Sequence, residues 1–163
     1  MPSYRRAFIP GGTWFFTVNL LRRRHNDLLI RERHSFQIDA WVILPEHLHC
    51  VWTLPPGDSD FSMRWRLIKS EFSPALPKTE RRLEVRKAAG ERGIWQRHYW
   101  EHFIRDDADY QRYVDYVHAN PLKHGHVKRV ADWPYSTFHR HVAKGIYSSD
   151  WCGDINCEIG GDE

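Results

Sequence analysis

The sequence predicts an α+β sandwich of the ferredoxin-like (RRM-like) type, with a central, mainly antiparallel sheet of four or five strands and helices packed on one face. Its 163 residues suit one domain with a hydrophobic core. Several short segments are rich in β-branched and aromatic residues, as strands are. Two of these segments are separated only by Pro45 and Glu46, and so short a link makes them antiparallel neighbours.

Four strands are predicted, each from its own pattern. Segment 13–21 combines β-branched with aromatic residues. Segment 36–44 alternates, which places its apolar residues on one face: Phe36, Ile38, Ala40, Val42 and Leu44. Segment 47–54 follows the two-residue break, and the aromatic-rich segment 94–105 supplies a fourth strand. Residues 22–35 connect the first two strands, so any helix between them must be short.

Two of the three predicted helices are recognised by the residues at their ends. Asp60 is a helix N-cap for 61–72, and this helix must end before Pro74. A short helix is predicted over 136–144, where Gly145 supplies the C-terminal signal.

The remaining helix begins after Asp106, and acidic residues in its first turn suit the positive end of the helix dipole. Pro121 is expected to end it, because the residue before a proline disfavours helical angles. Its buried stripe recurs at helical spacing and consists of Tyr110, Tyr113, Val114 and Val117.

The whole chain, 1–163, is expected to form a single domain with a polar insertion at 74–93 and an acidic tail at 150–163. The tail contains five acidic residues and no lysine or arginine, so the rest of the chain has 24 basic and 16 acidic residues. A basic body that is rich in aromatic residues can bind phosphates and stack on bases.

Membrane and secreted classes are excluded by composition. No apolar run approaches the roughly 20 residues of a membrane span, and the first residues lack the apolar stretch of a secretory signal. Three cysteines, an odd number, argue against a disulfide framework and fit a reducing compartment. We therefore expect a cytoplasmic protein that does not bind membranes.

His47 and His49 are the first candidate site residues. Residues two apart in a strand point to the same face, with Cα atoms about 7 Å apart, so both imidazoles can bind one divalent ion. Leu48 and Cys50 then face the opposite side, into the core. The alternative is a pair of partly exposed histidines on an edge strand, because a chain with eleven histidines contains His-x-His patterns by chance.

Tyr116 and Asn120 are the second candidate pair. Their spacing of four places them one above the other on one helical face. A phenol near an ion that polarises a phosphate can attack phosphorus, and an amide oxygen suits Mg²⁺ or Mn²⁺. The alternatives are a half-buried aromatic that completes the core for Tyr116, and a helix C-cap before Pro121 for Asn120.

Four segments, taken in order, resemble the REP-associated tyrosine transposases. These are bacterial relatives of the single-tyrosine insertion-sequence transposases, within the His-hydrophobic-His endonuclease superfamily. The match spans nearly the whole chain, although 22–35 is shorter and 74–93 longer than in the family. The matching segments are GGTWFFTVNL (11–20), AWVILPEHLHCVWTLP (40–55), IWQRHYWEHFIRDDADYQRYVDYVHANPLKHGHV (94–127) and DWPYSTFHRHVAKGIYSSDW (132–151).

The resemblance implies a role for each candidate. His47 and His49 occupy the positions of the metal-binding histidines in the PEHLH strand. Tyr116 occupies the position of the nucleophile in VDYVHANP, and Asn120 that of the third metal ligand. The implied activity is cleavage and transfer of single-stranded, hairpin-forming REP-type DNA through a 5′-phosphotyrosine intermediate. It requires a divalent metal, Mg²⁺ or Mn²⁺, and no nucleotide cofactor; a monomer is implied.

Basic and aromatic residues near the expected site are candidates for DNA binding. Lys123 and the residues after it follow the nucleophile helix directly and are the best placed to hold the cleaved strand. Tyr4 and Trp65 are candidates for stacking on unpaired bases, although Trp65 also fits the buried face of a helix. Each arginine, taken alone, also fits a solvated surface position that does not contact DNA. The acidic tail is expected to compete with DNA. The full set is Tyr4, Arg5, Arg6, Arg64, Trp65, Lys123, His124, Lys128 and Arg129.

Two other functions are compatible with these residues. One is a non-catalytic domain of the same fold that binds DNA or RNA hairpins. The other is a metal-dependent hydrolase that uses a bound water instead of tyrosine. The presence of all three site residue types favours the transposase.

Overall fold

Four strands form one antiparallel sheet in the computed structural model, which describes residues 6–19, 35–75, 78 and 84–153. The spatial order is β2-β3-β1-β4, and every neighbouring pair is antiparallel. The predicted antiparallel sheet is therefore confirmed. Because β3 lies between β2 and β1, its two histidines are on an interior strand, not on an edge. The strands are β1 (Thr13–Asn19), β2 (Gln37–Ile43), β3 (His47–Thr53) and β4 (Trp100–Phe103).

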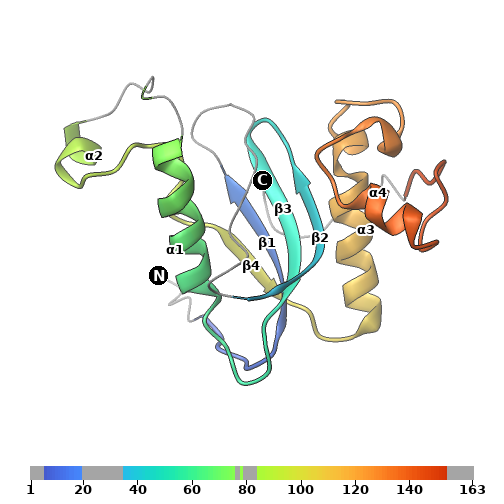
Figure 1. The fold of residues 1–163 in the computed structure, drawn as a ribbon, viewed down its shortest axis with the longest axis horizontal. Helices are drawn as coiled ribbons and strands as arrows, with labels where there is room; N and C mark the ends of the chain where they lie inside the picture. Colours follow the sequence, from blue (N-terminus) through green and yellow to red (C-terminus); the bar gives the residue numbers. More distant parts are fainter. Residues whose placement is uncertain (1–5, 20–34, 76–77, 79–83, 154–163) are drawn as a thin grey trace, which may run out of the picture.

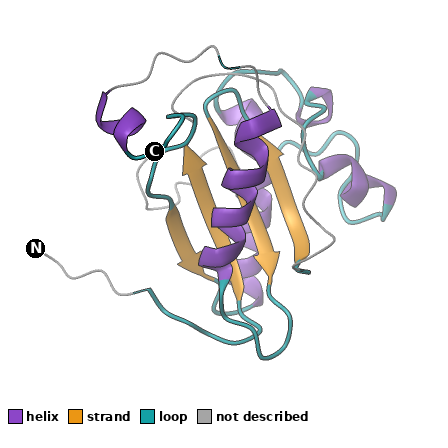
Figure 2. Ribbon diagram, turned by 60° about the vertical axis from the view of Figure 1, so that its left-hand side comes forward, coloured by secondary structure: helices purple, strands orange, loops and turns teal. Residues whose placement is uncertain are grey.

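Helices cover both faces of this sheet (Figure 1). Helix α1 (Phe61–Phe72) lies on one face, and α3 (Asp107–Lys123) and α4 (Phe138–Ala143) lie on the other. Figure 2 shows one helix crossing the strands in front, with a second behind them. The α+β class is confirmed, but the expectation that the helices share one face is wrong. The strands bury apolar side chains on both sides, and each side must be covered.

A β-bulge in β2 explains why its apolar residues do not share one face. The pairing with β3 shifts between Ile38 and Ala40, so the alternation changes sides at Asp39. Phe36 and Ile38 pack on the α1 side, whereas the residues from Ala40 onward that were expected beside them pack on the α3 side. Asp39 is held at the bulge because its carboxylate accepts hydrogen bonds, one of them from Thr53 at 2.7 Å.

Helix α1 has the predicted bounds, and its start is explained by the predicted cap. The carboxylate of Asp60 accepts the backbone N–H of Met63 at 2.8 Å. The polar insertion contains the short helix α2 (Glu84–Ala88). One-turn 3-10 helices lie at Ser73–Ala75 and Val130–Asp132.

Helix α3 begins as predicted but ends later than predicted. The Asp106 side chain caps it by accepting the N–H of Asp109 at 2.8 Å. Pro121 lies inside the helix, so the expectation that it ends the helix is wrong. The last turn is closed instead at Gly125, where φ is +69° and the N–H groups of residues 125 and 126 bond back to Leu122 and Pro121.

Some predictions fall on residues that the structure does not describe. Tyr4, Arg5, most of the 22–35 connection and the acidic tail beyond residue 153 lie outside the described ranges. Among the described helices, none is long and apolar enough to cross a membrane.

Candidate active site

His47 and His49 lie on the face of β3 that is turned toward α3. Their ring centroids are 4.6 Å apart. The core residues Leu48 and Cys50 point to the α1 side, as predicted. His49 is 1% exposed. Its Nδ1 is 2.9 Å from Oγ1 of Thr17, the residue of β1 that lies opposite it in the sheet. This hydrogen bond fixes the ring, and with the proton on Nδ1 the lone pair lies on Nε2.

Tyr116 comes from helix α3 and meets His49 face to edge. The centroids of the two rings are 5.2 Å apart, with an angle of 70° between the planes. Phe15 supports the tyrosine ring from β1 at 5.9 Å, and Tyr116 as a whole is 8% exposed. Nζ of Lys123, two turns later on the helix, lies 5.0 Å from the ring centroid. A phenol, an ammonium group and two imidazoles therefore lie together.

Asn120 is fully buried on helix α3, between a residue of this helix and its C-cap residue, both of which contact the site histidines. On one helical face, Tyr116 packs on His49 and His124 packs on His47, the latter with ring centroids 5.4 Å apart. Asn120 lies four residues from each helical partner, midway along that face. Among the described residues, neither its Oδ1 nor its Nδ2 has a hydrogen-bond partner. A buried amide in this state costs about 1–3 kcal/mol, so the site favours a polar ligand.

The electrostatics of the site favour a neutral, metal-competent imidazole. Burial lowers the pKa of His49 well below its ordinary value, and the positive charges of His47, His124 and Lys123 lower it further. His49 is therefore neutral at pH 7, and its Nε2 has no hydrogen-bond partner in the described part of the chain. A neutral imidazole with a free lone pair is the form that binds metals.

Comparison with known proteins connects this geometry to a family. The REP-associated tyrosine transposase of Escherichia coli (strain K12) is 50% identical over 167 residues, covering 95% of this chain and 93% of its own length. A putative REP-associated tyrosine transposase of Haemophilus influenzae is 41% identical over 175 residues, covering 99% of both chains. This chain is a REP-associated tyrosine transposase family member. No protein-family model matches the chain.

A solved structure agrees with this assignment. The structure of a REP-associated tyrosine transposase bound to a REP hairpin superimposes with a TM-score of 0.77 at 47% identity. It covers 100% of this chain and 98% of that chain. The resemblance seen in the sequence is thereby confirmed, and so is the α+β fold.

The described residues that were predicted to bind DNA lie in two places, on the α1 side of the sheet and in the segment that ends α3 and follows it. Arg64 and Trp65 are 4% and 1% exposed, so the prediction that they contact DNA is wrong. The Arg64 guanidinium is held by Asp58 at 2.6 Å and by backbone oxygens, and Trp65 packs in the core under α1. Helical position alone did not show that this face is turned to the sheet. Arg6 also lies on the α1 side, paired with Glu101 at 3.3 Å.

The residues after α3 do lie at the site. Lys123 and His124 contact Tyr116 and His47, as described above, while Lys128 and Arg129 are exposed further along the loop. Arg129 pairs with Asp132 at 2.6 Å.

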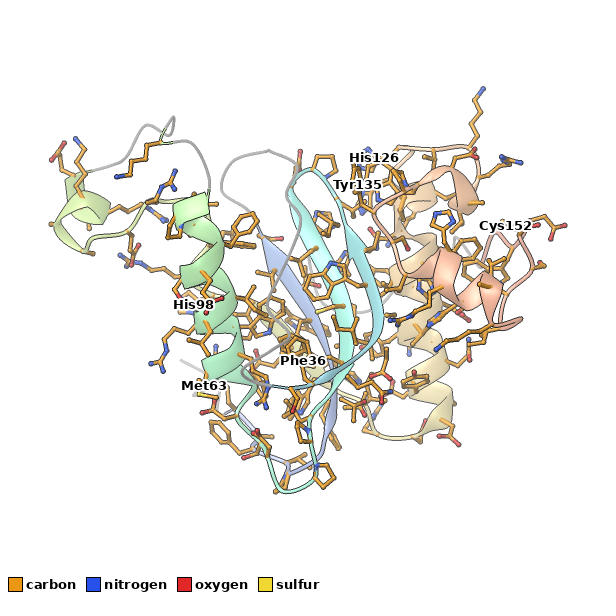
Figure 3. The ribbon with its side chains drawn as sticks, viewed as in Figure 1. Phe36, Met63, His98, His126, Tyr135 and Cys152 are labelled. Carbon is orange, nitrogen blue, oxygen red and sulfur yellow. The ribbon has the colours of Figure 1, made fainter. Side chains whose placement is uncertain are left out.

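A series of rings continues outward from His47, and the sequence analysis named its first member, His124, but not the tryptophan and tyrosine beyond it. After His124 come His126, Trp133 and Tyr135, with successive centroids 6.1, 5.4 and 5.9 Å apart. Figure 3 shows His126 and Tyr135 close together near the β2–β3 end of the sheet. Both are exposed at the surface. Sequence spacing gave no signal of this ring series, because its members come from a loop without periodicity.

Proposed function

We propose that this chain is a metal-dependent endonuclease and strand transferase that acts, as a monomer, on hairpin-forming REP-type DNA. The observation that supports this most strongly is the approach of the Tyr116 ring to 5.2 Å from the buried, neutral imidazole of His49. A tyrosine and a metal-competent histidine so placed supply a nucleophile and a means of binding the phosphate it attacks.

The residues present fit a divalent ion. In the described ranges no three His, Cys, Asp or Glu side chains are arranged to bind a metal, so among these residues a third ligand beside His47 and His49 is another kind of donor. The buried amide of Asn120, which lacks a hydrogen-bond partner among the described residues, is such a donor. His47, His49 and Asn120 would hold Mg²⁺ or Mn²⁺, and the bound ion would supply Lewis-acid polarisation of the scissile phosphate.

Tyr116 supplies the attacking oxygen in the proposed reaction. As its Oη bonds to phosphorus, the bond from phosphorus to the leaving O3′ breaks, and the phenol proton is lost while O3′ gains one. The products are a 5′-phosphotyrosine and a free 3′-hydroxyl, which can reverse the step on another strand. Nζ of Lys123 lies 5.0 Å from the centroid of the Tyr116 ring, so its positive charge is close to the phosphate that the tyrosine attacks.

The proposed substrate is supported from two directions. The similar solved structure is of a transposase bound to a REP hairpin. In this chain the exposed rings of His126 and Tyr135 lead away from His47, and aromatic rings in such a row stack on unpaired bases. In the proposed reaction, unpaired bases at the foot of the hairpin bind these rings while the bond beside them is cut.

The experiment compares Tyr116→Phe with Tyr113→Phe on a labelled REP-type hairpin with Mn²⁺. Both substitutions remove one phenolic oxygen from helix α3, but the Tyr113 ring lies against Phe15 and His102 at 4.6 and 4.5 Å. Tyr116→Phe should abolish cleavage and the protein–DNA adduct while hairpin binding continues, and Tyr113→Phe should retain both. Cleavage by Tyr116→Phe would identify a hydrolase that uses water. Absence of cleavage by the unmodified chain would identify a non-catalytic binding domain.

A further inference from the structure

A basic hollow lies beside α1, on the side of the sheet opposite Tyr116, and we call it the arginine groove. It is bounded by α1, α2 and segment 90–99 and has a volume of about 640 Å³. Its described lining contains one acidic residue, Glu91, which pairs with Arg97 at 3.1 Å and Arg86 at 3.7 Å. The cationic side chains that line it are Arg6, Arg66, Lys69, Arg86, Arg92 and Arg97.

The cations of this groove crowd one another over two aromatic rings. Arg6 lies 4.7 Å from the ring centroid of Tyr99, and Nζ of Lys69 lies 5.2 Å from the same centroid. Nζ of Lys69 is also 5.9 Å from the Trp95 ring. Burial, together with the charge of Arg6, lowers the pKa of Lys69 to about 8. Glu91 lies in the described lining and Glu101 pairs with Arg6 at its border, so two carboxylates face six cations. This excess of positive charge favours a polyanionic ligand.

Gln96 connects the arginine groove to the active site. It lines the groove and also a second hollow of about 370 Å³ that contains His47, His124 and His126. Its N–H donates to the Asn19 carbonyl at 3.0 Å, and its carbonyl accepts from Lys69 at 2.9 Å. Gln96 is therefore shared by the hollow that contains His47 and by the arginine groove.

We propose that the arginine groove binds the sugar–phosphate backbone of the hairpin stem while the foot of the hairpin lies at Tyr116. This assignment rests on the proposed function. The Tyr99 and Trp95 rings lie beneath cations, so among its described residues the groove offers charges for phosphates and no open ring for a base. Exposed rings occur on the other side of the site, at His126 and Tyr135. In this proposal, paired and unpaired DNA bind to different surfaces of the protein.

The test is the affinity for a REP-type hairpin, measured by fluorescence anisotropy over a range of salt concentrations. The double variant Arg66→Ala/Arg97→Ala removes two exposed groove cations. It should weaken binding about tenfold and lower the slope of log Kd against log salt by about 2, because each lost phosphate contact removes about 0.9. The matched control, Arg112→Ala/Lys144→Ala, removes the same charge from α3 and the end of α4, across the sheet.

Glu91→Gln tests the sign of the effect. Removing the one carboxylate in the groove's described lining should tighten hairpin binding and steepen the salt slope. An unpaired oligonucleotide with the flanking sequence should bind all groove variants equally. Equal hairpin affinity for the two double variants would overturn the groove assignment, and so would weaker binding by Glu91→Gln. If the unmodified chain forms no adduct at Tyr116, the proposed chemistry is refuted. The groove assignment is tested separately, because its test measures only hairpin affinity.

Discussion

Replacement of Asn120 by leucine should stabilise the metal-free protein, although most changes to a fully buried residue do the opposite. Asn120 is 0% exposed, and its amide atoms have no hydrogen-bond partner in the described structure. Replacing a buried amide that lacks hydrogen bonds by an apolar side chain of similar volume raises the free energy of unfolding by about 2 kcal/mol. At about 2–4 °C per kcal/mol for a protein of this size, the Tm should rise by about 4–8 °C.

The assay is thermal unfolding with EDTA and then with saturating Mn²⁺. The unmodified chain should gain stability with Mn²⁺, about 2.7 kcal/mol at a concentration 100 times Kd, whereas Asn120→Leu should gain little and should not cleave DNA. Asn19→Leu is the control, because Asn19 is partly exposed and its amide donates to Gln96 at 3.4 Å. A lower Tm for Asn120→Leu in EDTA would refute the reasoning, because the amide would then be satisfied in the folded protein.

Three further outcomes follow from other contacts. Arg64→Ala should lower the free energy of unfolding by about 3 kcal/mol, because a buried guanidinium bonded to Asp58 is lost; adduct yield per folded molecule should not change. Gly125→Ala should destabilise by about 1–2 kcal/mol in urea unfolding, since φ is +69° there. Lys69, whose pKa is lowered to about 8, loses its charge as pH rises through 8. Hairpin affinity should therefore fall between pH 7 and 9, and Lys69→Arg should remove this dependence.

Local signals in the sequence were sufficient for several elements. The caps Asp60 and Asp106 predicted two helix starts because each carboxylate accepts a backbone N–H within the next turn. The period of two in a strand placed His47 and His49 on one face. These features depend on neighbours in the chain, so their patterns are visible without tertiary structure.

Features that depend on distant contacts were missed or misjudged. Pro121 is accommodated because the helix needs only one more turn before Gly125 closes it. The burial of Trp65 depends on which face of α1 packs against the sheet. The alternating pattern of segment 36–44 gives no indication of the bulge at Asp39. The arginine groove joins α1, α2 and segment 90–99, so its charges gather only in the folded chain.

The most direct test of the central claim is identification of the amino acid that becomes linked to DNA. The chain is incubated with a hairpin and Mn²⁺, denatured and digested, and the modified peptide is sequenced by mass spectrometry. We expect a nucleotide attached through its 5′-phosphate to Tyr116, with no adduct in His49→Ala. A nucleotide on another residue, or cleavage without any adduct, would contradict the account.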